Sequence, residues 1–129
     1  MSDIDNPDIW LTRARSSLAR AQQGRLDEDI LYEDLCFDCH QAAEKSIKAV
    51  LVFLKEDFPW THSISKLFSL LESHLKISDE FRSADLLTRY ATKTRYPGEY
   101  EPLTEDDYQE ALLIAKRIYH WAEESIGLL

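Results

Sequence analysis

The sequence predicts an all-α protein, an up-and-down bundle of four to five helices forming a single domain over residues 1–129. Three observations favour this class. Apolar residues recur at the spacing of amphipathic helices along most of the chain. Only three glycines and four prolines are available for turns. No stretch alternates apolar and polar residues for long enough to indicate a β-strand.

The first two helices are predicted from Pro7 to about Gly24 and from about Asp27 to Lys55. Asn6 can cap the first helix, Pro7 suits its first position, and Gly24 can end it in the left-handed conformation. Asp27 begins an acidic turn of the kind that favours a helix N-terminus. The wide apolar stripe of the second helix indicates that it is the central helix of the bundle.

Three further helices are predicted after Pro59, which disfavours helix at the residue before it. Thr61 or Ser63 can cap the third helix. Ser78, followed by two acids, begins the fourth, which ends before the Pro-Gly pair at residues 97–98. Thr104 begins the last helix, with an aspartate three residues later that forms an acidic variant of the capping box.

The acidic composition restricts possible partners. A formal net charge of −9 opposes non-specific attraction to nucleic acid or anionic membranes, so any such contact requires a local positive patch. No apolar run approaches the length of a membrane span, about 20 residues. The first ten residues lack the basic and apolar segments of a signal peptide, so we expect a cytoplasmic protein with two reduced cysteines.

The segment Cys36-Phe-Asp-Cys39-His40 matches the spelling of a c-type haem attachment box. We interpret it as the interior of the second helix, because the chain shows no export signal and its only methionine is the initiator. No second paired ligand motif accompanies it, so no metal and no cofactor is predicted. The sequence contains neither a nucleophile elbow nor a glycine-rich phosphate loop.

A polar stripe runs along the same helix. Gln41, Glu44, Lys45 and Lys48 are spaced at i, i+3, i+4 and i+7, which places them on one face. This stripe is either a solvated surface with a favourable Glu44–Lys48 pair or one side of a binding site.

Residues 86–98 form a basic window, a segment that contains no aspartate or glutamate. Its cations and aromatic residues are Arg89, Lys93, Arg95, Tyr90 and Tyr96. Such a window is typical of a site for phosphate and base, although cations also gather in the last turn of a helix for dipole reasons.

Four segments together resemble a known family. They are CHQAAEKSIKAVLVFL at 39–54, WTHSISKL at 60–67, TRYP at 94–97 and EALLIAKRIYHWAEE at 110–124. The sequences, order and spacing of these segments are similar to those of the HEPN family over essentially the whole chain.

The resemblance implies a compact helical bundle that is usually a homodimer associated with nucleotides or RNA. Members are often encoded beside a minimal nucleotidyltransferase in toxin–antitoxin-like pairs. The positions that match the family's shared polar residues, with one from the basic window, are Gln41, Glu44, Lys45, Lys48, His62, Arg89, Arg95 and Tyr96. Lys45, Lys48 and Arg95 are expected to contact phosphate, and Tyr96 to stack or hydrogen-bond.

One departure from the family concerns catalysis. Ribonuclease members carry an arginine followed four to six residues later by a histidine, and neither Arg89 nor Arg95 is followed in this way. The only downstream histidine is His120, in the last helix. No catalytic residue is therefore assigned, and the leading hypothesis is a nucleotide- or RNA-binding module. The alternatives are a metal-independent endoribonuclease with a non-standard site, in which His62 could substitute, and a purely structural interaction protein.

Overall fold

A computed structural model describes residues 3–92, 97–98 and 101–128 of the chain. Arg95 and Tyr96 lie outside these residues. The α-helices are α1 (Pro7–Gln22), α2 (Tyr32–Phe53), α3 (Ile64–Leu71), α4 (Asp85–Thr92) and α5 (Glu105–Leu128). Two short 3-10 helices, Asp3–Asp5 and Asp79–Ala84, accompany them, and no β-strand occurs in the described residues. The predicted all-α class is confirmed.

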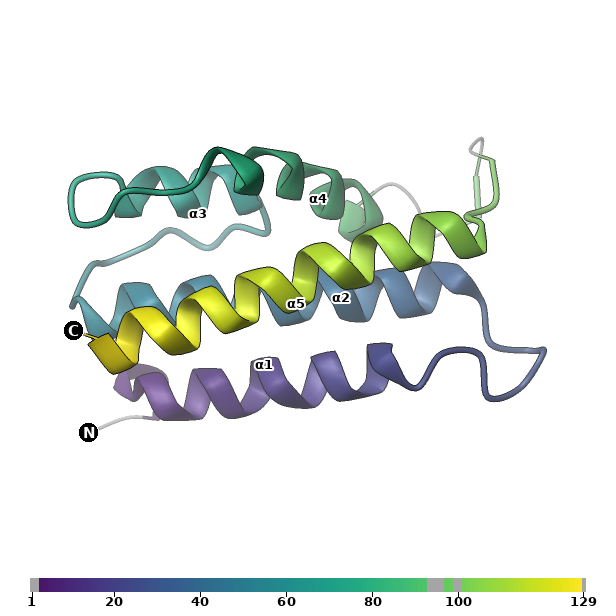
Figure 1. The fold of residues 1–129 in the computed structure, drawn as a ribbon, viewed down its shortest axis with the longest axis horizontal. Helices are drawn as coiled ribbons and strands as arrows, with labels where there is room; N and C mark the ends of the chain where they lie inside the picture. The colour runs from purple at the N-terminus through teal and green to yellow at the C-terminus, as the bar shows by residue number, and fades with distance from the viewer. Residues whose placement is uncertain (1–2, 93–96, 99–100, 129) are drawn as a thin grey trace.

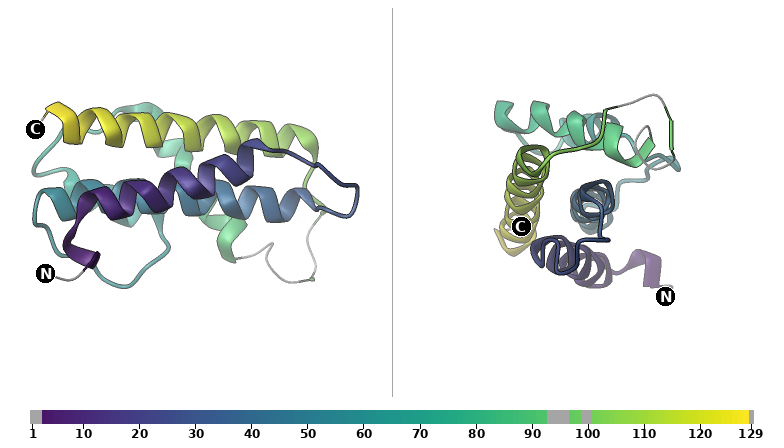
Figure 2. Two further views of the ribbon diagram at one scale, coloured as in Figure 1. Left: turned by 90° about the horizontal axis from the view of Figure 1, so that it is seen from below. Right: turned by 90° about the vertical axis from the view of Figure 1, so that its right-hand side faces the viewer.

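The long helices run up and down, with α1 antiparallel to both α2 and α5 (Figure 1). Viewed along the bundle, α3 and α4 form a layer on the side opposite α1 (Figure 2, right). The second helix, α2, contacts α1, α3, α4 and α5, and its contacts with α1 and α5 are the most extensive. This arrangement confirms α2 as the central helix.

One hydrophobic core joins buried residues from all five α-helices. The thiols of Cys36 and Cys39 lie fully within it, as expected for residues of a helix interior. Burial raises the pKa of Cys36 to about 12 and raises that of Cys39 as well. Both thiols therefore remain protonated at neutral pH and are shielded from reagents.

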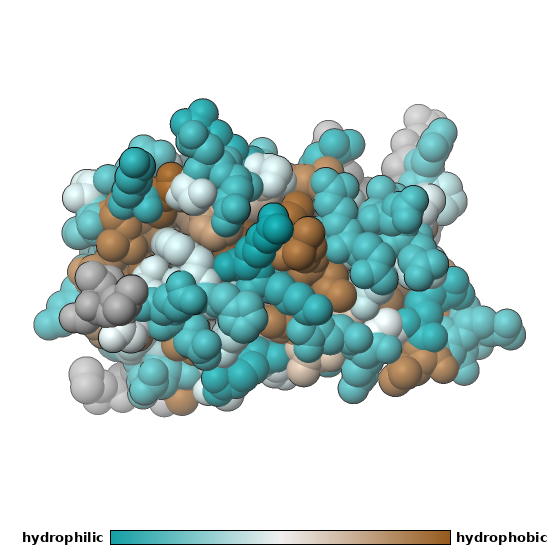
Figure 3. Space-filling model, in the orientation of Figure 1, coloured by the Kyte–Doolittle hydropathy of each residue, from teal (hydrophilic) through white to brown (hydrophobic). Residues whose placement is uncertain are grey.

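The outer surface reflects the amphipathic helices. The face that carries α5 is mostly hydrophilic, with apolar patches between the polar side chains (Figure 3). Within the described residues, none of the helices is both long enough and apolar enough to cross a bilayer.

Several helix ends follow the sequence signals. Asn6 Oδ1 and Ser63 Oγ accept hydrogen bonds from backbone N–H groups in the first turns of α1 and α3. Thr104 and Asp107 form the expected reciprocal cap at α5, in which each side chain accepts from the other residue's N–H at 3.2 and 2.8 Å. Gly24 adopts φ +70° after α1, the conformation for which glycine was expected.

The start of α2 differs from the prediction. It begins at Tyr32 rather than Asp27, because local hydrogen bonds hold the acidic segment in turns. Asp27 Oδ1 accepts from the Asp29 N–H at 2.8 Å, and the Asp27 carbonyl accepts from Ile30. Side chains of this type compete with the helix for backbone donors. The fourth predicted helix also begins differently, as the 3-10 helix Asp79–Ala84 that precedes α4.

The segment 54–63 joins α2 to α3 and positions the site described below. It starts with a tight helix end in which Glu56 N–H donates to Leu51 O at 2.9 Å and Lys55 N–H donates to Val52 O at 3.0 Å. Lys55 adopts φ 59° there, a left-handed conformation usual for glycine. The chain then turns back beside α2, so that Trp60 contacts Lys48 and His62 bonds to Glu44.

Candidate functional site

The predicted polar stripe forms one continuous face of α2. At about 100° per residue, the four positions from Gln41 to Lys48 fall within roughly 100° of arc. Their environments differ, because Glu44 and Lys48 are only 4% exposed while Gln41 and Lys45 are half-buried. The stripe is therefore partly a buried polar network and partly an accessible surface.

Glu44 is the centre of the buried network. Lys48 Nζ donates to Glu44 Oε2 at 2.9 Å, and His62 Nδ1 donates to Glu44 Oε1 at 2.7 Å. Burial opposes ionisation of this carboxyl, but the hydrogen bonds from Lys48 and His62 outweigh it and hold the pKa of Glu44 below its usual value. Glu44 is thus an anion that joins α2 to the returning segment.

His40 fixes the same segment through its backbone. Its Nε2 donates to the His62 carbonyl at 2.8 Å, while Nδ1 is the one buried side-chain nitrogen or oxygen in the described chain without a hydrogen-bond partner. Burial lowers the pKa of His40, with partial opposition from the bond to His62. A neutral His40 and an ionised Glu44 therefore hold His62 by its backbone and its side chain.

Three aromatic rings surround the Lys48 ammonium. Nζ lies 5.7 Å from the ring centroid of Trp10, 5.4 Å from that of Phe58 and 5.5 Å from that of Trp60. These distances are within the range of cation–π attraction. Trp10 and Phe58 also meet edge to face at 6.1 Å. Since Lys48 is buried, bonded to Glu44 and enclosed by rings, it organises the surface rather than projecting from it.

Sequence reasoning missed the aromatic residues of this site. The available signal was the Asp57-Phe58-Pro59-Trp60 segment, where two large rings stand in a polar, helix-breaking stretch. Trp10, in α1, is the third ring: its indole N–H donates to Ile4 O at 2.9 Å and its ring lies beside Lys48.

The accessible part of the site lies between α1 and α2. Trp10 faces Lys48 at one end of this antiparallel pair, and Arg20 bonds Asp38 at 2.7 Å ten residues further along α1. The same register places Arg13 opposite Lys45. Neither cation has an ion-pair partner among the described residues. Burial, then Arg20 and to a smaller extent Arg13, lower the pKa of Lys45.

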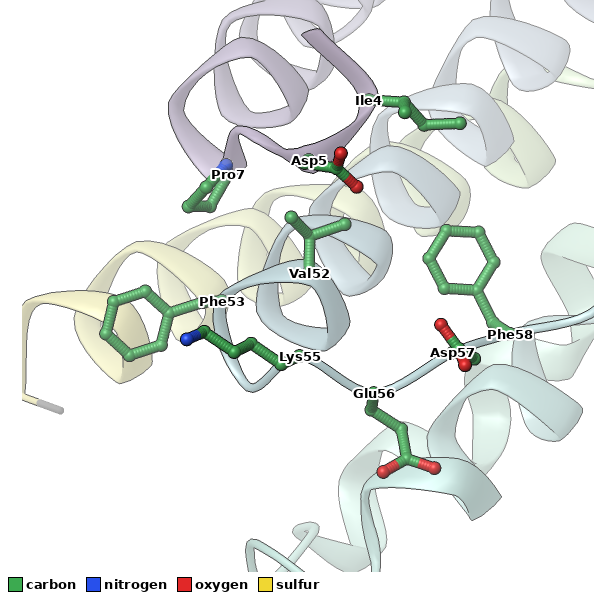
Figure 4. Close-up of a pocket in the computed structure, with 9 residues that line it drawn as sticks. All are labelled: Ile4, Asp5, Pro7, Val52, Phe53, Lys55, Glu56, Asp57 and Phe58. Carbon is green, nitrogen blue, oxygen red and sulfur yellow. The ribbon is translucent and has the colours of Figure 1, made fainter. Parts of the chain in front are cut away.

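A pocket of about 750 Å³ lies at the adjoining end of α1 and α2. Figure 4 shows its lining, in which Phe58 is the residue shared with the cluster around Lys48. The pocket carries carboxylates from Asp5, Glu56 and Asp57 against the single ammonium of Lys55. This excess of negative charge disfavours phosphate, so the pocket is not the natural place for an anionic ligand.

The other residues considered from the sequence lie elsewhere. Arg89 is exposed in the last turn of α4, and within the described residues it forms no ion pair with the α2 stripe. His120 is exposed on α5. No group of three or more metal-ligating side chains converges in the described part of the chain. The structure thus brings together Gln41, Glu44, Lys45, Lys48 and His62.

Comparisons with known proteins identify the family. The model of the HEPN domain matches residues 8–125. The crystal structure of TT1696 from Thermus thermophilus is similar with a TM-score of 0.80 and 30% identity, covering 92% of this chain and 97% of that one. ST0689, an archaeal HEPN homologue, is similar with a TM-score of 0.73 and 29% identity, covering 94% and 98%.

An HEPN domain protein from Thermotoga maritima shares the fold, with a TM-score of 0.54 and 24% identity over 92% of both chains. No curated protein sequence matches the chain. The resemblance inferred from the four sequence segments is confirmed by the family model, which spans nearly the whole chain. The chain belongs to the HEPN domain family.

Proposed function

We propose that this HEPN-domain protein binds a nucleotide or RNA through phosphate at the α1–α2 face. The observation that carries the proposal is the pair formed by Arg13 and Lys45, two cations opposite each other with no ion-pair partner among the described residues. In a chain with net charge −9, these two cations form a local positive patch, which is what an anionic ligand would require here.

The roles of the stripe residues follow from their partners. Lys45 and Arg13 contact phosphate, and Gln41, on the same face of α2, can donate a hydrogen bond to it. Glu44 and Lys48 neutralise each other and hold the surrounding elements in place. Arg89, Arg95 and Tyr96 remain predicted contributors to binding.

The test uses single substitutions that remove one positive charge each. Lys45→Ala and Arg13→Ala are expected to weaken binding of a short RNA and to reduce the dependence of affinity on salt, because each phosphate contact releases counterions. Arg117→Ala, which removes an exposed cation from α5, is the matched control. It should change neither the affinity for RNA nor the dependence of that affinity on salt. Titration calorimetry at two salt concentrations gives both quantities. Equal losses in all three variants would show a diffuse effect of net charge and refute the site.

A second candidate is a metal-independent endoribonuclease with a non-standard site. It is favoured by His62, whose side chain is 52% exposed while its Nδ1–H is oriented by the buried Glu44 carboxylate. This arrangement leaves Nε2 available as a general base. His62 would take the proton of a 2′-hydroxyl as the 2′-oxygen attacks the adjacent phosphorus. The bond to the 5′-oxygen breaks, and that oxygen is protonated from water.

The chain offers a matched control for this activity. His74 pairs with Glu56 at 3.0 Å on the surface, so it is a second histidine with a carboxylate partner. If the enzyme hypothesis holds, RNA cleavage by the purified protein is lost in His62→Ala and retained in His74→Ala. Absence of cleavage by the unaltered protein, tested on single-stranded and structured RNA, rejects it.

The assembly state and partner are also proposals, supported by the family to which the chain belongs. We expect a cytoplasmic homodimer that acts with a minimal nucleotidyltransferase in a toxin–antitoxin-like system. Sedimentation equilibrium tests the dimer, and co-purification with the product of a neighbouring gene tests the partner. A purely structural interaction protein would form the complex but show no affinity for nucleotide or RNA.

A further inference from the structure

Trp60 is the most exposed large apolar side chain in the described part of the protein. It is 90% exposed, compared with 73% for Leu26, the next in rank. The ring contacts the protein through the Lys48 ammonium, which lies 5.5 Å from its centroid. A tryptophan with one such contact and the rest of its surface open to solvent leaves apolar area available to a planar partner.

The segment that carries Trp60 is anchored just beyond it. Two residues later, His62 bonds to Glu44 through its side chain and to His40 through its carbonyl. The Ile64 N–H then donates to Thr88 Oγ1 at 3.1 Å on α4. Because these bonds fix the segment before any ligand arrives, stacking on Trp60 would cost little conformational entropy.

The ring also lies close to the proposed phosphate site. Lys48 and Lys45 are three residues apart on α2, so their Cβ atoms are neighbours separated by about 5–6 Å. Trp60 contacts the first of these lysines, and Arg13 lies opposite the second. A ligand that places a phosphate at Lys45 therefore brings its attached base into the neighbourhood of Trp60.

We propose that Trp60 is a stacking platform for an unpaired nucleobase, which makes single-stranded nucleic acid the ligand class of this site. The inference rests on the proposed phosphate-binding function and specifies its ligand. An unpaired base offers a free π-face to an aromatic side chain, whereas the bases of a duplex already stack on one another. Bare polyphosphate has the charge that Lys45 recognises but no ring for Trp60.

The experiment compares four ligands by titration calorimetry: a single-stranded RNA, the single-stranded DNA of the same sequence, the RNA duplex and tripolyphosphate. The proteins are the unaltered chain, Trp60→Ala, Trp60→Phe and Lys45→Ala. We expect Trp60→Ala to weaken single-strand binding by roughly 5- to 150-fold, the range of a lost base–aromatic stack. Trp60→Phe should retain most of the affinity. Trp60→Ala should leave tripolyphosphate binding unchanged, while Lys45→Ala weakens every ligand.

The outcomes separate the inference from the function on which it rests. If the single strand binds and Trp60→Ala changes nothing, the stacking platform is wrong and the phosphate site stands. If no ligand binds the unaltered protein, the phosphate site itself is wrong, and the stacking inference falls with it. Duplex binding as tight as single-strand binding would also overturn the inference, because paired bases offer no free π-face to Trp60. Sedimentation of Trp60→Ala provides one more test, because loss of self-association would assign the ring to a protein contact and overturn the proposal.

Discussion

Replacing Glu44 with glutamine tests the buried network at its centre. The substitution keeps the shape of the side chain but removes its charge. It leaves the Lys48 ammonium, whose side chain is 5% exposed, with a neutral amide in place of its counter-ion among the three aromatic rings. An uncompensated buried charge of this kind destabilises a protein strongly.

The expected loss in the free energy of unfolding is about 3 kcal/mol, the lower end of the range for breaking a buried pair, because His62 is half exposed and can be rehydrated. For a chain of this size the loss corresponds to a fall in Tm of roughly 10–15 °C. Glu56→Gln is the matched control, since Glu56 pairs with His74 at a partly exposed position and should lose less than about 1 kcal/mol.

Urea denaturation of Glu44→Gln, Lys48→Met and the double variant completes a thermodynamic cycle. The double variant should recover part of the loss, because removing both charges leaves neither unpaired. The effect should also depend on pH. The pKa of Glu44 is depressed in the folded state, so its contribution is present above the unfolded value near 4.5 and is lost as pH falls through the folded pKa. A loss below about 1 kcal/mol at pH 7, or additive single effects, would refute the reasoning.

Two further predictions concern single residues. Burial lowers the pKa of His40, so the unfolded chain binds a proton there more readily, and the free energy of unfolding should fall as pH decreases through the usual value of 6.5. Urea titrations at pH 5.5 and 7.5 should show this fall in the unaltered protein and a smaller one in His40→Gln. Lys55 adopts φ 59°, so Lys55→Gly should raise stability by about 0.5–1 kcal/mol, measured as an increase in Tm, whereas Lys55→Ala should not.

Much of the fold could be predicted from local sequence signals. The caps at Asn6, Ser63 and Thr104 depend on side chains that bond within their own first turn, and the structure shows each of them. The start of α2 could not be predicted as well. Asp27 has the chemistry of both a helix start and a turn, and the choice between them depends on the bonds that the whole 25–30 segment makes.

Only part of the candidate site could be predicted from the sequence. Helical periodicity places Gln41, Glu44, Lys45 and Lys48 on one face, and the resemblance to the HEPN family adds His62. Periodicity does not say which of these residues are buried, because burial depends on what covers the helix. The returning segment 54–63 makes the Glu44–Lys48 pair internal and leaves Lys45 at the surface.

The sequence by itself determined the helical class, the family and the central place of α2, because these follow from periodicity, capping residues and short motifs along the chain. Tertiary structure decided how the stripe on α2 is used. The antiparallel register of α1 sets Arg13 opposite Lys45, and the return of the chain after Pro59 brings Trp60 to Lys48 and His62 to Glu44. Contacts between residues far apart in sequence depend on how elements pack, and no local pattern encodes them.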